Sequence, residues 1–212
     1  IRANQYGGVR IGDSNITMID NEVLYNGTGG AYVEAGVYVS GVWNTTVYLV
    51  RNHIHHNRHL YATAQGGGVY VAPAAEGWVT LSDNLIEDNT AGKSEWIPDD
   101  GYGGGVYING SRVTLEGNLI QNNTAIGFIG PVNQQGGLGG GVYIRGNPIL
   151  RNNVITGNRA SFSGSGIYIC GSAPELYHNT IAQNAWESDA TGIYVAEASS
   201  TERAQPKLWN TI

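Results

Sequence analysis

The chain has little of several residue types on which other classes of protein depend. Its 212 residues include one cysteine, one methionine and two phenylalanines, and charged residues make up 13% of the total. A single cysteine, Cys170, excludes an internal disulfide framework and a cysteine-based zinc site. Because no basic stripe is available to meet phosphates, nucleic acid is not expected as a partner. No apolar run approaches the roughly 18 residues of a membrane helix, so no membrane insertion is expected within this segment.

Glycine and asparagine are abundant instead, with 32 and 21 residues. Glycine does not recur at every third position, which excludes collagen. The hydrophobic content of 41% and the 13 tyrosines exclude a disordered chain. The length suits a single domain over residues 1–212 with a sizeable core.

A short motif, Asn-x-(Ile/Val)-x-x-Asn, recurs along the chain. Its six full copies begin at Asn21, Asn52, Asn84, Asn118, Asn153 and Asn179. These asparagines are 31, 32, 34, 35 and 26 residues apart, so the motif is constant and the extra residues belong to loops. A seventh copy begins at Asn210, where Lys207 occupies the position that holds leucine or methionine in the others. This copy is either an end of the repeat or a strand offset by one residue.

Two further segments complete each repeat. A Gly-(Val/Ile)-Tyr-(Val/Ile) motif lies between the asparagine motifs, and alternating apolar residues precede the first four of them, as is typical of half-buried strands. Three short strands per repeat, with no helix signal, predict an all-β parallel β-helix (β-solenoid) of six to seven coils. The predicted inward column is Val23, Ile54, Ile86, Ile120, Ile155 and Ile181.

The repeated asparagines have a structural explanation. At a bend, asparagine can adopt left-handed dihedral angles, and its amide can bond the same amide in the coils above and below. We therefore expect an asparagine ladder and assign none of these residues to catalysis.

The three-strand coil and the ladder asparagines resemble a right-handed parallel β-helix of the pectate-lyase-like kind over almost the whole chain. The pairing of Gly-Gly-x-(Val/Ile) with Ile-x-x-Asn also resembles the repeats of bacterial polymorphic outer-membrane adhesins, in which phenylalanine stands in place of Ile or Val. The first resemblance implies a polysaccharide lyase or hydrolase and the second a surface adhesin. The Asn-Thr-Asp, Gly-His-Gly and Arg-Ile-Lys motifs of polygalacturonases are absent here, and no calcium-binding carboxylate cluster like that of pectate lyases is visible.

Loops of variable length lie between the two motifs, and those at 90–104 and 124–140 are the longest. Insertions at one position of a solenoid repeat emerge on one face, so these two loops should be neighbours and wall a groove. The candidate ligand-binding residues in the first loop are Trp96, Asp99 and Asp100. The alternative is loop variation without function.

A column of six tyrosines runs through the second motif, with Tyr70, Tyr107 and Tyr143 at its centre. An outward column could stack sugar rings or bury itself against another protein. The alternative is tyrosine stacking that stabilises a flat sheet under covering loops.

Histidines and carboxylates occupy matching positions in two neighbouring repeats. Coils stack about 4.8 Å apart, so His55 should lie over Glu87 and His56 over Asp88. Such a cluster is a weak candidate for a metal site or acid–base chemistry. A solvated polar strip with modest ion pairing is the preferred interpretation, and no cofactor is expected.

The sequence is therefore compatible with two functions. The first is an extracellular or cell-surface structural or adhesive module, whose partners are copies of itself, other surface proteins or glycans. The second is a polysaccharide lyase or glycoside hydrolase with its site in the loop-walled groove. Neither end carries a recognisable cap, so we expect the domain to continue in a longer chain or to pair end to end into a filament.

Overall fold

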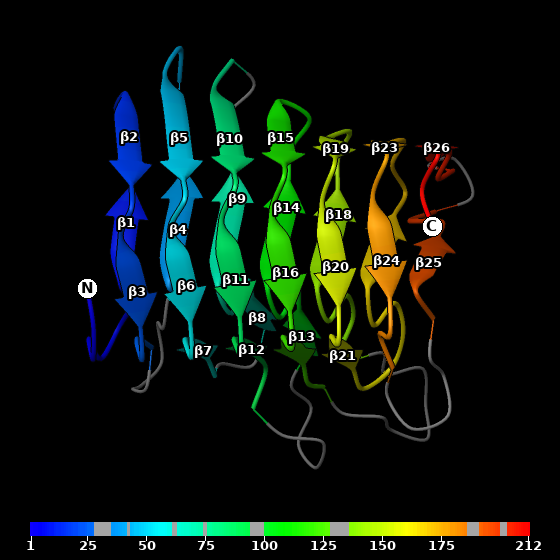
Figure 1. Ribbon diagram of the computed structural model, residues 1–212, viewed down its shortest axis with the longest axis horizontal. Coiled ribbons are helices and arrows are strands. Elements are labelled where there is room, and N and C mark those ends of the chain that lie inside the picture. Colours follow the sequence, from blue (N-terminus) through cyan, green and yellow to red (C-terminus); the bar gives the residue numbers. More distant parts are fainter. Residues whose placement is uncertain are drawn as a thin grey trace.

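The computed structural model describes residues 1–27, 35–41, 43–60, 63–73, 76–93, 100–127, 136–185, 191–199 and 203–212. These residues wind into a stack of coils whose strands lie side by side along the long axis, from β1 and β2 at one end to β25 and β26 at the other (Figure 1). All pairs of named strands in the described ranges are parallel, and each inner coil pairs with the coil before it and the coil after it. No helix in the described part of the chain is long and apolar enough to cross a membrane.

Three long sheets form the faces of the stack. The tyrosine sheet, named for its tyrosine column, contains β1 (Val9–Ile11), β4 (Val37–Ser40), β9 (Val69–Ala72), β14 (Val106–Asn109), β18 (Val142–Arg145), β22 (Ile167–Cys170) and β25 (Ile193–Ala196). The leucine sheet contains β2 (Ile16–Ile19), β5 (Thr46–Val50), β10 (Trp78–Ser82), β15 (Val113–Glu116), β19 (Ile149–Arg151), β23 (Glu175–Tyr177) and β26 (Lys207–Trp209). The isoleucine sheet contains β3 (Glu22–Leu24), β6 (His53–His55), β11 (Leu85–Glu87), β16 (Leu119–Gln121), β20 (Val154–Thr156) and β24 (Thr180–Ala182).

Two shorter sheets were not expected from the repeats. A four-stranded sheet follows the closing asparagines and contains β7 (Arg58–His59), β12 (Thr90–Ala91), β17 (Thr124–Ala125) and β21 (Arg159–Ala160). A further pair is formed by β8 (Thr63–Gln65) and β13 (Asp100–Tyr102). Both arise from the loops between the two motifs, where the spacing in the sequence is irregular and gives no strand signal.

The expected number of six to seven coils is slightly high. Within the described ranges, about five turns are complete coils stacked between two neighbours. The first coil has a neighbour on one side only, and the last contributes β25 and β26 but no strand to the isoleucine sheet.

The predicted inward column is confirmed in its register and, except at its last member, in its burial. Val23, Ile54, Ile86, Ile120 and Ile155 are fully buried, whereas Ile181 is partly buried. The β ladder aligns all six residues from coil to coil. Burying one such side chain contributes about 1.5–3 kcal/mol, so this column is a large part of what holds the coils together.

The bends between sheets place the left-handed dihedral angle one residue earlier than the sequence predicts. It is found immediately before the ladder asparagine, as at Asp83 before Asn84 and Asp88 before Asn89, with φ of 55° and 53°. None of the twelve motif asparagines in the six full copies has a positive φ. The bend therefore comes first, and the asparagine that follows satisfies the backbone groups that the bend leaves unpaired.

The asparagine ladder itself is confirmed, and it occurs twice, once for each motif asparagine. The amide nitrogen of Asn84 donates to Oδ1 of Asn118 (2.9 Å), and that of Asn118 donates to Oδ1 of Asn153 (2.9 Å). The same Oδ1 of Asn118 accepts the backbone N–H of Asn84 (3.0 Å), while Nδ2 of Asn118 also donates to the carbonyl of Leu81 (2.9 Å). A ladder side chain inside the stack, such as Asn118, thus joins three successive coils.

The seventh copy of the motif is offset by one residue, as one of the two sequence interpretations has it. Leu208, rather than Lys207, pairs with Leu176 in the leucine sheet. Asn210 accordingly takes the left-handed position, with φ of 46°, and Thr211 takes the ladder position. The Thr211 hydroxyl donates to the carbonyl of Leu176 (3.3 Å), as the asparagine amides do in the earlier coils.

Replacement of Asn118 by alanine is expected to destabilise the fold strongly. It removes the acceptor of two Asn84 donors and the donor to the Leu81 carbonyl, whereas Oδ1 of Asn153 keeps the Asn118 backbone N–H. Each buried group left unsatisfied costs about 1–3 kcal/mol. The matched control is Asn109→Ala, because Asn109 is exposed at the end of β14. Urea unfolding of the two variants measures the difference, and equal midpoints would contradict the role of the ladder.

Gly105→Ala is expected to destabilise by about 1–3 kcal/mol through overpacking. A Cβ at Gly105 would lie 2.7 Å from the backbone oxygen of Gly141 and 2.9 Å from Nδ2 of Asn123. Gly12→Ala is the control, since no atom lies within 4 Å of a Cβ built there. Thermal unfolding should separate the two variants by several degrees, and an unchanged melting temperature for Gly105→Ala would be the contrary result.

Candidate functional site

An outer layer covers the middle of the tyrosine sheet. Strand β8 pairs with β13, and Tyr102 at the end of β13 forms a parallel bridge with Leu138. The Leu138 amide donates to the carbonyl of Gly101 (2.8 Å), so the described ends of the loops 90–104 and 124–140 lie side by side as expected.

The tyrosine column stacks ring on ring. Successive centroids from Tyr38 to Tyr194 are 4.5, 5.2, 5.2, 5.4 and 5.3 Å apart, and neighbouring rings are within 13° of parallel. Tyr107, Tyr143 and Tyr168 are buried, with exposed fractions of 5–7%, and pack with Leu138. The ring faces therefore contact one another, and this agrees with the alternative in which tyrosine stacking stabilises a covered sheet.

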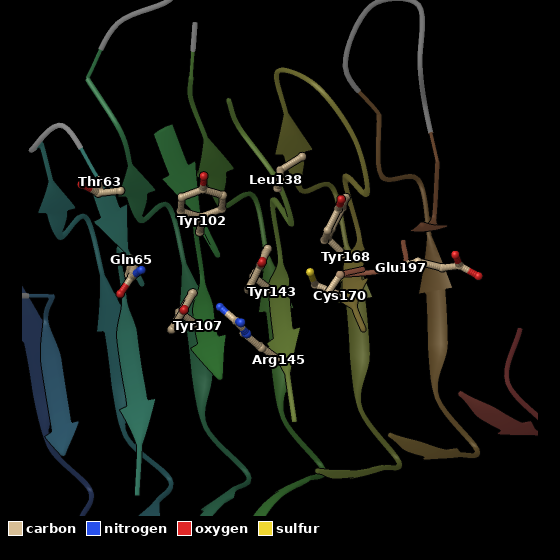
Figure 2. A pocket seen from close by; sticks show the side chains of 11 residues that line it. Thr63, Gln65, Tyr102, Tyr107, Leu138, Tyr143, Arg145, Tyr168, Cys170 and Glu197 are labelled. Carbon is tan, nitrogen blue, oxygen red and sulfur yellow. The ribbon is translucent and has the colours of Figure 1, made fainter. Parts of the chain in front are cut away.

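A cavity of about 460 Å³ lies between the tyrosine sheet and the outer layer (Figure 2). Tyr107, Tyr143 and Tyr168 form its floor, Tyr102 and Leu138 line it from the outer layer, and further polar residues surround them. These further residues are Thr63, Gln65, Arg145, Cys170 and Glu197, joined by Ala198. We call this cavity the tyrosine groove.

The phenol groups of the groove are held in their neutral form. Burial raises the pKa of Tyr168 to about 12 and raises the pKa of Tyr107 and Tyr143 above the ordinary value. Burial also raises the pKa of Tyr102, assisted by Asp100, whose carboxylate accepts the Tyr102 hydroxyl at 3.1 Å. The groove thus offers hydroxyl groups that donate and accept hydrogen bonds at neutral and alkaline pH.

The candidate residues fall into three groups. Tyr107 and Tyr143 line the groove, and Asp100 contacts it through Tyr102. Tyr70 is half-buried and stacks in the column beside the groove. Trp96 and Asp99 lie outside the described residues.

Sequence reasoning missed Arg145 and Cys170 as groove residues. Each stands two positions after a column tyrosine, and residues two apart on a strand share one face. The alternation of inward and outward residues along these strands therefore predicts that the side chains of Arg145 and Cys170 point outward beside the tyrosines.

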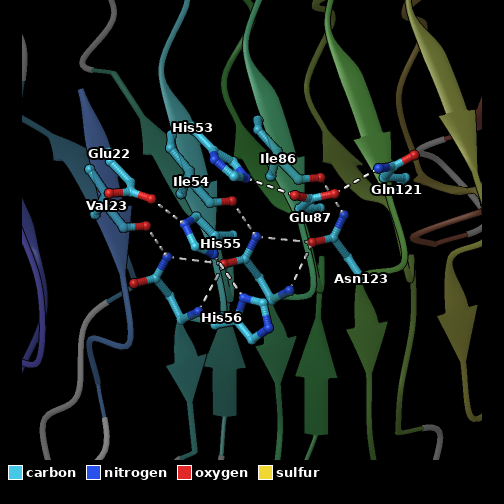
Figure 3. Close-up of polar contacts among 12 residues, drawn as sticks. Glu22, Val23, His53, Ile54, His55, His56, Ile86, Glu87, Gln121 and Asn123 are labelled. Atoms are coloured by element: carbon cyan, nitrogen blue, oxygen red, sulfur yellow. Dashed lines mark hydrogen bonds and ion pairs between the residues drawn. The ribbon is translucent and has the colours of Figure 1, made fainter. Parts of the chain in front are cut away.

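The histidine cluster forms on the isoleucine sheet, but its side chains pair differently from the expectation (Figure 3). The backbone of His55 lies opposite Glu87, as predicted. The Glu87 carboxylate, however, contacts Nε2 of His53 at 2.7 Å, and Nε2 of His55 contacts Glu22 at 3.2 Å. His53 and His55 stack with centroids 3.9 Å apart, and their rings point to partners on opposite sides.

The other two residues predicted for this cluster, His56 and Asp88, lie in different places. Nδ1 of His56 lies 2.8 Å from Nδ1 of His55 and so belongs to the cluster. Asp88 lines a polar cavity of about 290 Å³ with Asn122, Thr124, Gly157 and Arg159. His56 and Asp88 occupy matching left-handed positions in neighbouring coils, and among the described residues no hydrogen bond or ion pair joins their side chains.

Hydrogen bonds fix the charge of Glu87. Burial would raise its pKa, but hydrogen bonds from Gln121 (2.6 Å) and His53 together hold the pKa of this carboxyl below its usual range. Glu87 is therefore a carboxylate held between two donors at neutral pH.

The fold defines the class of protein: a parallel β-solenoid with three long sheets and two side-chain amide ladders. The family model described as "Right handed beta helix region" matches residues 1–97 and 97–205. The chain therefore belongs to the right-handed β-helix family. Searches of curated proteins and of solved structures give no match.

His59 in β7 is a half-buried histidine next to a residue that lines the groove. Its Nδ1 lies 3.0 Å from the carbonyl oxygen and 3.2 Å from the amide nitrogen of Gln65, a groove residue. Burial lowers its pKa, against the smaller opposing effect of the Gln65 carbonyl. His59 is therefore neutral at pH 7.

The neutral state of His59 predicts a loss of stability in weak acid. Its contribution is fully present above the unfolded pKa of about 6.5 and is lost as the pH falls toward the lower folded pKa, with a slope of at most about 1.4 kcal/mol per pH unit. His59→Gln removes this slope and keeps an acceptor for the Gln65 amide. Urea midpoints of wild type and variant between pH 5 and 8 give the difference, and a difference that does not change with pH would be the contrary outcome.

Proposed function

We propose that this chain is a structural and adhesive β-helix module of an extracellular or cell-surface protein, and that it binds a saccharide chain in the tyrosine groove. The observation that carries the proposal is the row of phenol hydroxyls in a cavity large enough for a small ligand. Assembly of copies into a filament, and the adhesin resemblance, remain predictions within this proposal.

The stacked geometry determines how a saccharide would bind. The faces of Tyr107, Tyr143 and Tyr168 contact one another, so they are not available to stack sugar rings. Their edges and hydroxyls face the groove. One tyrosine comes from each coil, and successive ring centroids are 5.2–5.4 Å apart. A regular row of hydroxyls suits an extended polymer whose own hydroxyls also recur regularly.

Arg145 favours an acidic saccharide. Arg145 supplies a guanidinium group to the lining of the groove, and it forms no ion pair with another described residue. The carboxylate that lines the groove, Glu197, lies 4.0 Å from Arg203. Arginine binds carboxylates through two parallel hydrogen bonds. A uronic acid unit would therefore gain a charge-assisted contact that a neutral sugar lacks.

Cleavage of the saccharide, by a lyase or a glycoside hydrolase, is the second candidate function. It is favoured by the presence of Arg145 and a carboxylate, Glu197, at one cavity. Hydrolysis usually requires two carboxyl groups flanking the bond, and the described lining residues supply one. Binding without cleavage is therefore the first proposal.

The double substitution Tyr107→Phe with Tyr143→Phe tests the hydroxyl row, because it removes two hydroxyls and keeps the stacking. Each lost hydrogen bond is worth about 0.5–1.5 kcal/mol, so the Kd for an oligosaccharide should rise about 5-fold or more. Calorimetry with acidic and neutral oligosaccharides is the measurement. Arg145→Gln should weaken binding of the acidic compounds selectively.

Tyr48→Phe is the matched control, because Tyr48 is exposed on the leucine sheet, away from the groove. Absence of binding by wild type to every acidic and neutral saccharide tested would refute the proposal, as would equal affinity in the double variant. Release of new reducing ends or unsaturated sugars would establish the second candidate instead.

A further inference from the structure

Five polar side chains converge on the outer face of the isoleucine sheet at β3, β6 and β11 (Figure 3). Glu22, His53 and His55 each place one possible ligand atom within 4.8 Å of the others. His56 contacts His55, and Glu87 contacts His53, at 2.8 and 2.7 Å. We call this group the histidine cluster.

The contacts of His55 constrain its protonation. Because Nδ1 of His55 and Nδ1 of His56 lie 2.8 Å apart, one of them carries the proton and the other accepts it. When the proton is on His55, its Nε2 is a lone pair that faces the Glu22 carboxylate at 3.2 Å. When the proton is on His56 instead, Nε2–H of His55 donates to Glu22. In either case a cation bound here would take the place between Nε2 of His55 and Glu22 that a proton can fill.

The contacts of His53 resemble the support that metal-binding histidines receive. Its Nε2–H donates to Glu87, and Glu87 is held in turn by the Gln121 amide. A carboxylate that takes one ring N–H of a histidine fixes its tautomer and directs the other nitrogen toward a metal. Nδ1 is then the His53 atom able to bind a cation.

Charge and accessibility also suit a divalent ion. With the imidazoles neutral, as metal ligands must be, the two carboxylates give the cluster a formal charge of −2. The Glu22 and His53 side chains are 61% and 37% exposed, so an ion can enter and these side chains can adjust, while His55 is only 11% exposed and gives a fixed point. Imidazole and carboxylate ligands select zinc and similar transition metals, whereas calcium prefers oxygen ligands alone.

We propose that Glu22, His53 and His55 form a binding site for Zn²⁺ or a similar divalent transition-metal ion, with Glu87 and His56 as positioning residues. This site differs from the solvated polar strip expected from the sequence. Coil stacking alone pairs Glu87 with His55, whereas the side chains pair Glu87 with His53 and bring Glu22 to His55. The site is independent of the tyrosine groove. The ion would join β3 to β6 and so cross-link two neighbouring coils.

The test is a titration of the metal-stripped protein with Zn²⁺, followed by calorimetry and by thermal unfolding. Wild type should bind one Zn²⁺ per chain and melt at a higher temperature when Zn²⁺ is present, because the ion binds the folded state. Glu22→Gln and the pair His53→Gln with His55→Gln should abolish this saturable binding. Glu87→Gln should weaken it about 10- to 100-fold, as loss of a positioning carboxylate does.

Two controls make the result specific. His178→Gln removes an exposed histidine on another coil and should leave Zn²⁺ binding unchanged. Glu22→Gln changes a largely exposed side chain, so it tests the site even where the histidine pair variant fails to fold. The proposal is overturned when wild type shows no saturable Zn²⁺ binding, when Glu22→Gln binds as wild type does, or when His178→Gln loses binding equally.

Discussion

The hydrogen bond from one asparagine amide to the next is the interaction on which the rest of this structure depends. Every coil must bend sharply between sheets, and the left-handed residue at each bend leaves backbone groups without ladder partners. The oxygen of Asn118 accepts the Asn84 backbone N–H, and its amide donates to the Leu81 carbonyl and to Oδ1 of Asn153 in the next coil. Buried polar groups are tolerated only when paired in this way. The motif is therefore constant while loop lengths vary from coil to coil.

This constraint extends to glycines, which contribute no side chain to the ladder. The glycine that opens the tyrosine motif lies against a closing asparagine, as Gly105 lies against Asn123. A larger residue there would displace the amide, so the glycine and the asparagine recur together. The tyrosine two residues later then meets its copy in the next coil, and the parallel ladder fixes the rings 4.5–5.4 Å apart. Stacking in the column is thus a consequence of the same register that the amides maintain.

Much of the fold could be predicted from the sequence because it depends on repetition. The inward column from Val23 to Ile181 and the pairing of coils follow from a motif that keeps one phase through its six full copies. The sites could not be predicted equally well, since they depend on side-chain rotamers and on loops. His55 lies opposite Glu87 in the backbone, yet Glu87 reaches the neighbouring His53, and backbone register alone does not decide between the opposite and the diagonal partner. The pairing of β8 with β13 depends on loops that share no motif.

The ladder also explains where function can arise on such a rod. Inward residues and corner asparagines are fixed, but the outward positions of each strand are free to differ between coils. On the isoleucine sheet, His53 is followed in the next coils by Leu85 and Leu119, and His55 by Glu87 and Gln121. A cluster such as that around His55 therefore needs substitutions in only two or three adjacent coils, with no change to the core. The tyrosine groove uses the same freedom on another sheet, so the two sites can change independently within one frame.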